Sequence, residues 1–230
     1  MSTYVLIHGA GSDSWYWHLV VPELRGRGHD VVAPDLPCDD DAAGLREYTN
    51  AVVEAMAGHD TSDVVLVAQS LGGFTAPLVC EQVPVRLVIL VAAMVPQPGE
   101  LLGDWWDNIG WAEARQEQAE RDGTTPVGMD DIEGMFLHDL PPDLKAEAMH
   151  HGRDQSGTPF SERWPLAAWP AVPTRAVLCR DDRLFPPELQ RRVAKERLGI
   201  TPEEIDGGHL PALSRPKELT AVLERLRVGS

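Results

Sequence analysis

The chain has 230 residues and a formal net charge of −16, from 36 acidic and 20 basic side chains. This length suits one domain with insertions, and the acidic balance disfavours nucleic acid, anionic lipid and polyanionic substrates as partners. No run of about 18 apolar residues is present and no basic leader precedes the first apolar run, so we expect no membrane span and a cytoplasmic protein.

The first half of the chain alternates short apolar runs with helical patterns. Because the apolar runs are continuous rather than alternating, they indicate buried strands. Glycine and proline punctuate the boundaries. The expected strands are 4–8, 30–34, 64–67 and 85–93, and the expected helices are 12–27, 44–57 and 75–82.

The alternation stops after Pro96 and resumes near residue 174. Between them the sequence predicts only helices, at 102–109, 111–121, 130–137 and 142–150; then strands at 174–179 and 201–206 and helices at 187–198 and 216–227. Buried strands separated by helices predict an α/β fold, with a mostly parallel six-stranded sheet flanked by helices. We therefore expect a core of residues 1–95 and 166–230 and an inserted helical cap of residues 96–165.

A sharp turn from strand to helix is expected around Ser70. Ala68 and Gly72, two positions to either side, are small enough for such a turn, which would expose the hydroxyl above the sheet edge. The alternative is that Ser70 only caps the helix that follows.

Other polar residues follow strands and therefore meet at the same edge of a parallel sheet. His209, on the glycine turn after the last strand, is the candidate base for a serine nucleophile, and either Asp181 or Asp182 is the candidate acid, with Asp182 preferred. The N–H groups of Ala10 and Leu71 are the candidate oxyanion donors. Each candidate also has a purely structural interpretation. His209 could be a surface histidine, either aspartate could form a turn or cap a helix, and the glycines beside Ala10 could serve only a tight turn.

Aromatic residues of the insertion are candidates for a substrate pocket. Trp105, Trp106 and Phe136 could line it, or they could pack the insertion against the sheet. Leu210, directly after the candidate base, is a further candidate pocket residue.

No metal or cofactor site is expected. Cys38, Cys80 and Cys179 have no ligand-like spacing and are interpreted as reduced, mostly buried thiols. The adjacent His150 and His151 point apart on a helix and form no ligand set with His138.

These motifs together resemble the α/β-hydrolase family, over nearly the whole chain. Within it, they resemble the branch of plant methylesterases and hydroxynitrile lyases and their bacterial esterase relatives. The segments that carry the resemblance are 8–11, 15–18, 28–29, 33–36, the Ser70 turn, 136–139, Asp182 with Pro186, and 208–216.

The resemblance implies a Ser70–His209–Asp182 triad, an oxyanion hole from Ala10 and Leu71, and a helical cap. Two departures stand out. Ala68-Gln69 replaces a commoner Gly-His, and Gly9 and Leu210 stand where lyase members carry threonine and lysine.

We therefore expect a cofactor-free serine hydrolase acting on a small, largely neutral carboxylic ester or lactone. The alternatives are a non-catalytic, receptor-like binding protein and a hydroxynitrile or carbon–carbon lyase on the same fold.

Overall fold

The computed structural model describes residues 1–229 and contains one sheet of six strands, all parallel to their neighbours. The strand order is β2-β1-β3-β4-β5-β6. The strands are β1 Thr3–Ile7, β2 Asp30–Val32, β3 Val64–Gln69, β4 Leu87–Val91, β5 Thr174–Cys179 and β6 Glu203–Ile205. The predicted α/β fold with a six-stranded parallel sheet is confirmed, although β2 and β6 are shorter than expected.

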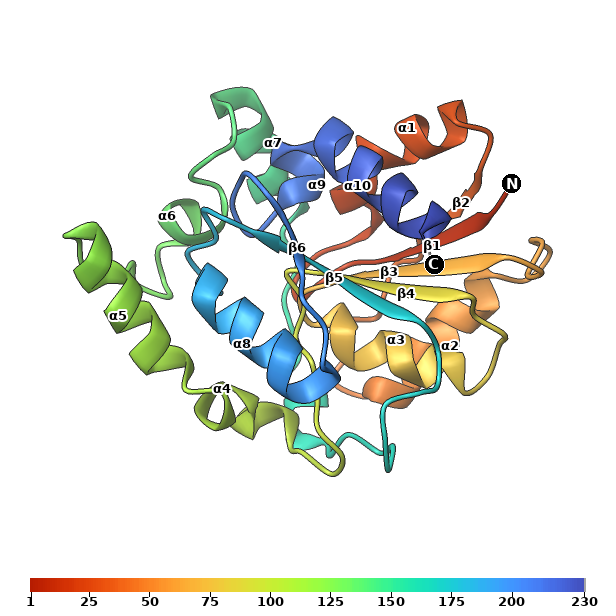
Figure 1. Cartoon of the computed structure of the whole chain (residues 1–230), viewed down its shortest axis with the longest axis horizontal. Coiled ribbons are helices and arrows are strands. Elements are labelled where there is room, and N and C mark those ends of the chain that lie inside the picture. The colour runs from red at the N-terminus through yellow and green to blue at the C-terminus, as the bar shows by residue number, and fades with distance from the viewer. Residues whose placement is uncertain (230) are drawn as a thin grey trace.

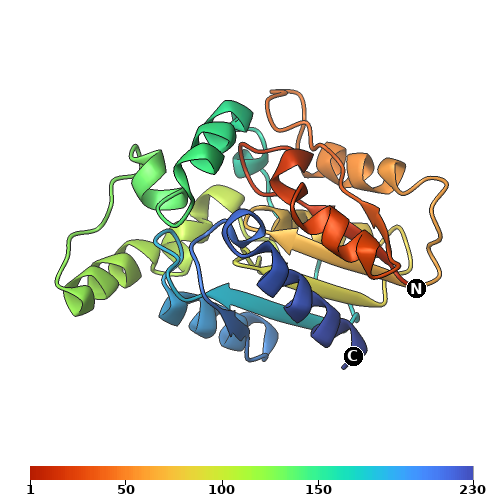
Figure 2. The same cartoon turned by 90° about the horizontal axis from the view of Figure 1, so that it is seen from above.

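Helices cover both faces of the sheet (Figures 1 and 2). One face carries α1 Val20–Gly26, α9 Pro211–Ser214 and α10 Pro216–Val228, and the other carries α2 Leu45–Ala55, α3 Gly72–Cys80 and α8 Pro187–Leu198. Successive strand residues therefore enter different cores: Val5 and Ile7 face α2 and α3, whereas Tyr4 and Leu6 face α1 and α10. Burial on both faces explains why the strands are continuously apolar.

The helix predicted over 12–27 is wrong as a single element. A 3₁₀ helix, η1 Ser14–Trp17, is followed by α1, which begins only at Val20. Pro22 gives the reason: it has no N–H, and in a continuous helix its ring would collide with the carbonyl of His18. Restarting at Val20 puts Pro22 in the first turn, where proline is tolerated. The short helix α9 was not predicted.

The segment between β4 and β5 is helical, as expected. Its elements are η2 Leu102–Asp104, α4 Trp105–Asn108, α5 Trp111–Asp122, α6 Ile132–Phe136, α7 Pro142–His151 and η3 Pro159–Ser161. Figure 1 shows α5, α6 and α7 beyond the carboxyl ends of the strands, on the side where open α/β sheets bind ligands. The division into a core and a cap with bounds 96–165 stays a prediction.

A buried ion pair joins the start of this segment to α8. Arg197 donates to Glu100 through two nitrogens, at 2.6 and 2.9 Å, and the two side chains are only 5% and 3% exposed. Asn108 and the N–H of Gln97 also donate to Glu100, so its carboxylate is fully hydrogen-bonded.

None of the helices within residues 1–229 is both long enough and apolar enough to cross a membrane. The cytoplasmic location stays a prediction.

Candidate active site

Ser70 lies on a strained turn between β3 and α3. The φ angle of Ser70 is +51°, in the left-handed region that residues other than glycine rarely adopt. The surrounding backbone holds the turn, because Ser70 N–H donates to Val91 and the Ser70 carbonyl accepts from Met94 and Gly73. The backbone that follows β4 passes so close to position 73 that only glycine fits there. A Cβ on Gly73 would lie 1.9 Å from the Met94 carbonyl oxygen. At Gly72, which the sequence predicted to be small for this turn, the nearest atoms to a Cβ would be 3.1 Å away.

Ser70, His209 and Asp182 converge at the edge of the sheet. His209 Nε2 lies 3.0 Å from Ser70 Oγ, and His209 Nδ1 lies 2.8 Å from Asp182 Oδ2. Ser70 is 8% exposed, His209 2% and Asp182 3%. A carboxylate can only accept, so Nδ1 donates to Asp182 and Nε2 is left to accept from the Ser70 hydroxyl.

The carboxylate of Asp182 is fixed by its own loop. Its Oδ1 accepts from the N–H groups of Leu184 and Phe185, both at 2.9 Å, and Oδ2 also accepts from Gln190 at 3.2 Å. Together with the bond from His209, both carboxylate oxygens are hydrogen-bonded, and the side chain is 0% exposed. Asp182 is therefore held in a single orientation.

Asp181, the alternative acid, faces another way. Its N–H donates to the Gly207 carbonyl at 3.0 Å, and its Oδ2 accepts from Gly207 N–H at 3.1 Å. Asp181 thus pairs with the turn before His209 and not with the imidazole ring.

Neither N–H of the two candidate oxyanion donors, Ala10 and Leu71, donates to another protein group within residues 1–229. His8 controls the orientation of the first, since its Nδ1 lies 2.8 Å from the Gly9 carbonyl and its Nε2 accepts from Leu36 N–H. The C=O and N–H of a planar trans peptide point in opposite directions. With the Gly9 carbonyl turned towards His8, the Ala10 N–H points away from it.

Burial lowers the pKa of His8, although the bond to the Gly9 carbonyl opposes this effect. The lowered pKa keeps the ring neutral, so that Nε2 can accept from Leu36 N–H. On the other side of the loop, Gly11 N–H donates to Gln155 Oε1 at 3.1 Å and the Gly11 carbonyl accepts from Arg153 N–H at 3.0 Å. Gln155 is a polar residue in an irregular segment, and no sequence pattern predicted its role.

A cavity of about 530 Å³ opens above Ser70. Of the predicted pocket residues, Trp106, Phe136 and Leu210 line it, together with Ala10, Leu71, Met94 and Leu184. Trp105 does not. Its ring is 2% exposed and its Nε1 donates to the Val95 carbonyl, so its expected place in the pocket is corrected to core packing.

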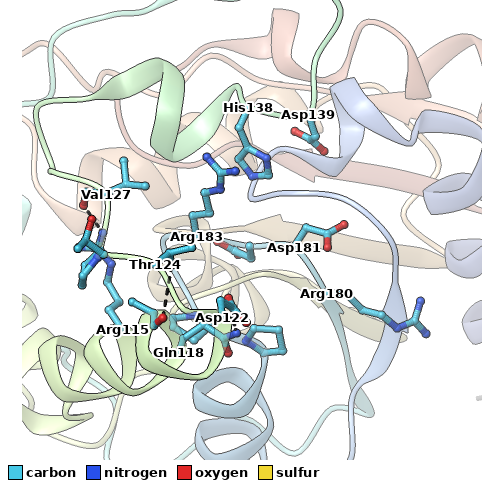
Figure 3. A pocket seen from close by; sticks show the side chains of 16 residues that line it. Arg115, Gln118, Asp122, Thr124, Val127, His138, Asp139, Arg180, Asp181 and Arg183 are labelled. Carbon is cyan, nitrogen blue, oxygen red and sulfur yellow. Dashed lines mark hydrogen bonds between the residues drawn. The ribbon is translucent and has the colours of Figure 1, made fainter.

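A second cavity, of about 610 Å³, is lined by residues of α5, of the segment after α6 and of the loop after β5 (Figure 3). Its lining includes charged and polar side chains, among them Arg115, Asp122, His138 and Arg183, and it also includes Asp182. Neither Ser70 nor His209 lines it, so it does not open onto the candidate nucleophile or base.

Within the described part of the chain, no group of three or more His, Cys, Asp or Glu side chains is placed to hold a metal ion.

A family model described as "Alpha/beta hydrolase family" matches residues 4–222. The chain belongs to this family. Among curated relatives, this hydrolase is 26% identical to Methylesterase 3 of Arabidopsis thaliana, over 95% of its own length and 93% of the relative. It is 24% identical to polyneuridine aldehyde esterase of Rauvolfia serpentina, over 96% and 93% of the two chains.

Solved structures show the same fold. The crystal structure of polyneuridine aldehyde esterase matches the hydrolase with a TM-score of 0.80 at 22% identity, covering 98% of this chain and 99% of that one. A pyrethroid hydrolase from Sphingobium faniae matches with a TM-score of 0.79 at 23% identity, covering 99% and 97%. The resemblance inferred from the sequence motifs is confirmed.

Proposed function

We propose that this hydrolase is a serine esterase that cleaves a small, largely neutral carboxylic ester or lactone through an acyl-enzyme on Ser70. The observation that carries the proposal is the hydrogen-bonded series Asp182–His209–Ser70, at 2.8 and 3.0 Å, which ends beneath the 530 Å³ cavity. The family membership and the names of its relatives, methylesterases and esterases, support ester hydrolysis.

In the first half-reaction Ser70 Oγ attacks the carbonyl carbon while His209 Nε2 takes the hydroxyl proton. Asp182 orients the ring and stabilises the imidazolium. The negative oxygen of the tetrahedral intermediate accepts from Ala10 and Leu71 N–H, which have no competing protein partner within residues 1–229. Collapse breaks the bond to the alcohol oxygen, and His209 passes its proton to the leaving alkoxide.

In the second half-reaction water takes the place of the alcohol. His209 removes a proton from the water as its oxygen attacks the acyl carbon, and the same N–H groups hold the second oxyanion. Collapse returns the proton to Ser70 Oγ and releases the carboxylic acid.

The lining of the cavity favours an apolar substrate. Met94, Trp106, Phe136, Leu184 and Leu210 surround the position above Ser70. An acidic chain with a net charge of −16 disfavours a highly anionic one. We therefore propose that the acyl or alcohol group of the ester is apolar.

Lyase chemistry is less well supported. A departing cyanide would need a cation beside His209, where Leu210 contributes an apolar side chain to the cavity. At Gly9 a Cβ would lie 2.4 Å from Gln69 Oε1 and 2.8 Å from Ser70 Cβ, so a threonine hydroxyl has no room there.

The proposal is tested with Ser70→Ala and an aryl ester such as p-nitrophenyl acetate. We expect turnover to fall by about four to six orders of magnitude, because the nucleophile and the acyl-enzyme are lost together. Wild-type protein should be labelled by a fluorophosphonate and release a burst of p-nitrophenol. A wild-type protein that binds the ester without a burst would instead indicate a receptor-like binding protein.

A further inference from the structure

The turn that presents His209 is held at three consecutive residues by side chains from three parts of the chain. Gly207 N–H donates to Asp181 Oδ2 at 3.1 Å, and Gly208 N–H donates to Asp139 Oδ2 at 2.7 Å. The His209 carbonyl accepts from Gln69 Nε2 at 3.1 Å. Asp181 and Gln69 follow or end strands of the sheet, whereas Asp139 lies between α6 and α7 of the insertion.

Asp139 makes the shortest of these three bonds. It ends the Phe136-Leu137-His138-Asp139 motif, to which the resemblance gave no role. A bond from a backbone N–H to a carboxylate is stronger than one to a neutral acceptor. Figure 3 shows Asp139 beside His138 at the edge of the second cavity, above Asp181.

The motif fits closely around the two glycines of the turn. A Cβ on Gly208 would lie 2.8 Å from His138 Nε2 and 3.0 Å from Asp139 Oδ1, and a Cβ on Gly207 would lie 3.2 Å from Asp139 Oδ2. Asp139 Oδ1 is buried and has no hydrogen-bond partner within residues 1–229. The bond to Gly208 is therefore the one hydrogen bond that this carboxylate makes in the described protein.

We propose that Asp139 is a positioning residue for His209: the insertion holds the imidazole in register with Ser70 through the Gly208 N–H. The inference depends on the proposed role of His209 as base. Losing the bond frees the turn next to His209, and small misplacements of a reacting group are costly in rate. Asp139 does not line the cavity above Ser70, so substrate binding is not affected directly.

The test is Asp139→Ala assayed with p-nitrophenyl acetate. We expect kcat to fall about 10- to 100-fold while KM changes by less than about 2-fold. In Asp139→Asn the side-chain oxygen can still accept from Gly208, so kcat should return to within about 5-fold of wild type. In Asp139→Glu the charge remains but the acceptor is displaced by a methylene, and kcat should stay low.

Asp122→Ala is the matched control. It removes a carboxylate from the wall of the same cavity, where Asp122 bonds only to Gln118 in the described chain, and it should leave kcat and KM unchanged. Unfolding temperatures measured for every variant separate misplacement of His209 from partial unfolding. If Asp139→Ala does not fold, the contrast between the Asn and Glu variants decides the question.

An unchanged kcat in Asp139→Ala, a loss carried by KM, or an Asn variant no better than the Glu variant would overturn the positioning role. These outcomes leave the esterase assignment intact as long as His209→Ala is inactive. Full turnover by His209→Ala would instead overturn the proposed function itself.

Discussion

At the scale of single residues, the orientation of neighbouring side chains decides which of two candidates can act. Asp181 and Asp182 are adjacent, yet one pairs with Gly207 and the other with the imidazole of His209. Trp105 and Trp106 are also adjacent, yet only the second lines the cavity above Ser70. Both contrasts can be tested by paired substitutions.

Asp182→Asn should lower kcat by about three to four orders of magnitude, because an amide can donate to Nδ1 and favours the wrong imidazole tautomer. Asp181→Asn should cost about 10-fold or less, because the amide oxygen can still accept from Gly207 N–H. Steady-state kinetics with an aryl ester measure both. Equal losses in the two variants would contradict the assignment of Asp182.

Trp106→Ala should raise KM for a bulky apolar ester about 10-fold with a smaller change in kcat, because it removes binding surface from the cavity wall. Trp105→Ala should instead lower the free energy of unfolding by about 3–5 kcal/mol, since that ring is buried in the core. Kinetics and urea unfolding on both variants distinguish the two roles. A rise in KM for Trp105→Ala together with a loss of stability for Trp106→Ala would contradict these roles.

At the scale of elements, the buried Glu100–Arg197 pair ties the insertion to α8. Glu100→Ala leaves a buried guanidinium without its carboxylate and should lower the free energy of unfolding by about 3–5 kcal/mol. Arg46→Ala removes an exposed partner of Glu47, and less than about 1 kcal/mol is expected. Urea unfolding measures both, and similar values for the two variants would show that burial does not set the cost.

Some helices and strands could be predicted from the sequence with their bounds, and others could not. β5 and α8 were predicted with the observed bounds, because continuous apolarity and helical spacing are local signals. The helix over 12–27 failed at Pro22, where one residue outweighs a regular pattern. In α4, four residues long, no periodicity can tell which tryptophan faces the cavity.

The candidate triad could be predicted from the sequence because its members follow strand ends. Gln155, which holds Gly11, and Asp139, which holds Gly208, were not assigned these contacts. Each lies in an irregular segment. The backbone group that a side chain contacts there depends on the tertiary arrangement of distant loops. The supporting residues of the site therefore become visible only in three dimensions.

At the scale of the whole molecule, a network around Glu224 on α10 joins the two ends of the fold. Glu224 accepts from Tyr4 on β1, from His29 Nε2 at 3.0 Å and from Arg227 at 3.2 Å. Burial alone would raise the pKa of Glu224, but the hydrogen bonds from Arg227, Tyr4 and His29 outweigh it and lower the pKa to about 2.

A depressed carboxylate pKa contributes stability that is present above the unfolded pKa and lost as pH falls through the folded one. Wild type should therefore be more stable than Glu224→Gln at pH 7, and the difference should shrink from about pH 4.5 down to about pH 2. Thermal unfolding of both proteins across this range measures the difference. A gap independent of pH would show that the ionised carboxylate is not its source.

The strand order β2-β1-β3-β4-β5-β6 has a consequence for a chain emerging from the ribosome. β3 pairs with β1, and from β4 onwards each newly synthesised strand joins the same edge of the sheet, beside the strand made before it. Ser70 is thus set in place early, while His209, its proposed proton acceptor, arrives only after β6 has docked. A nascent chain can assemble most of the sheet and still be inert, so reactivity towards ester bonds should appear abruptly at the end of synthesis.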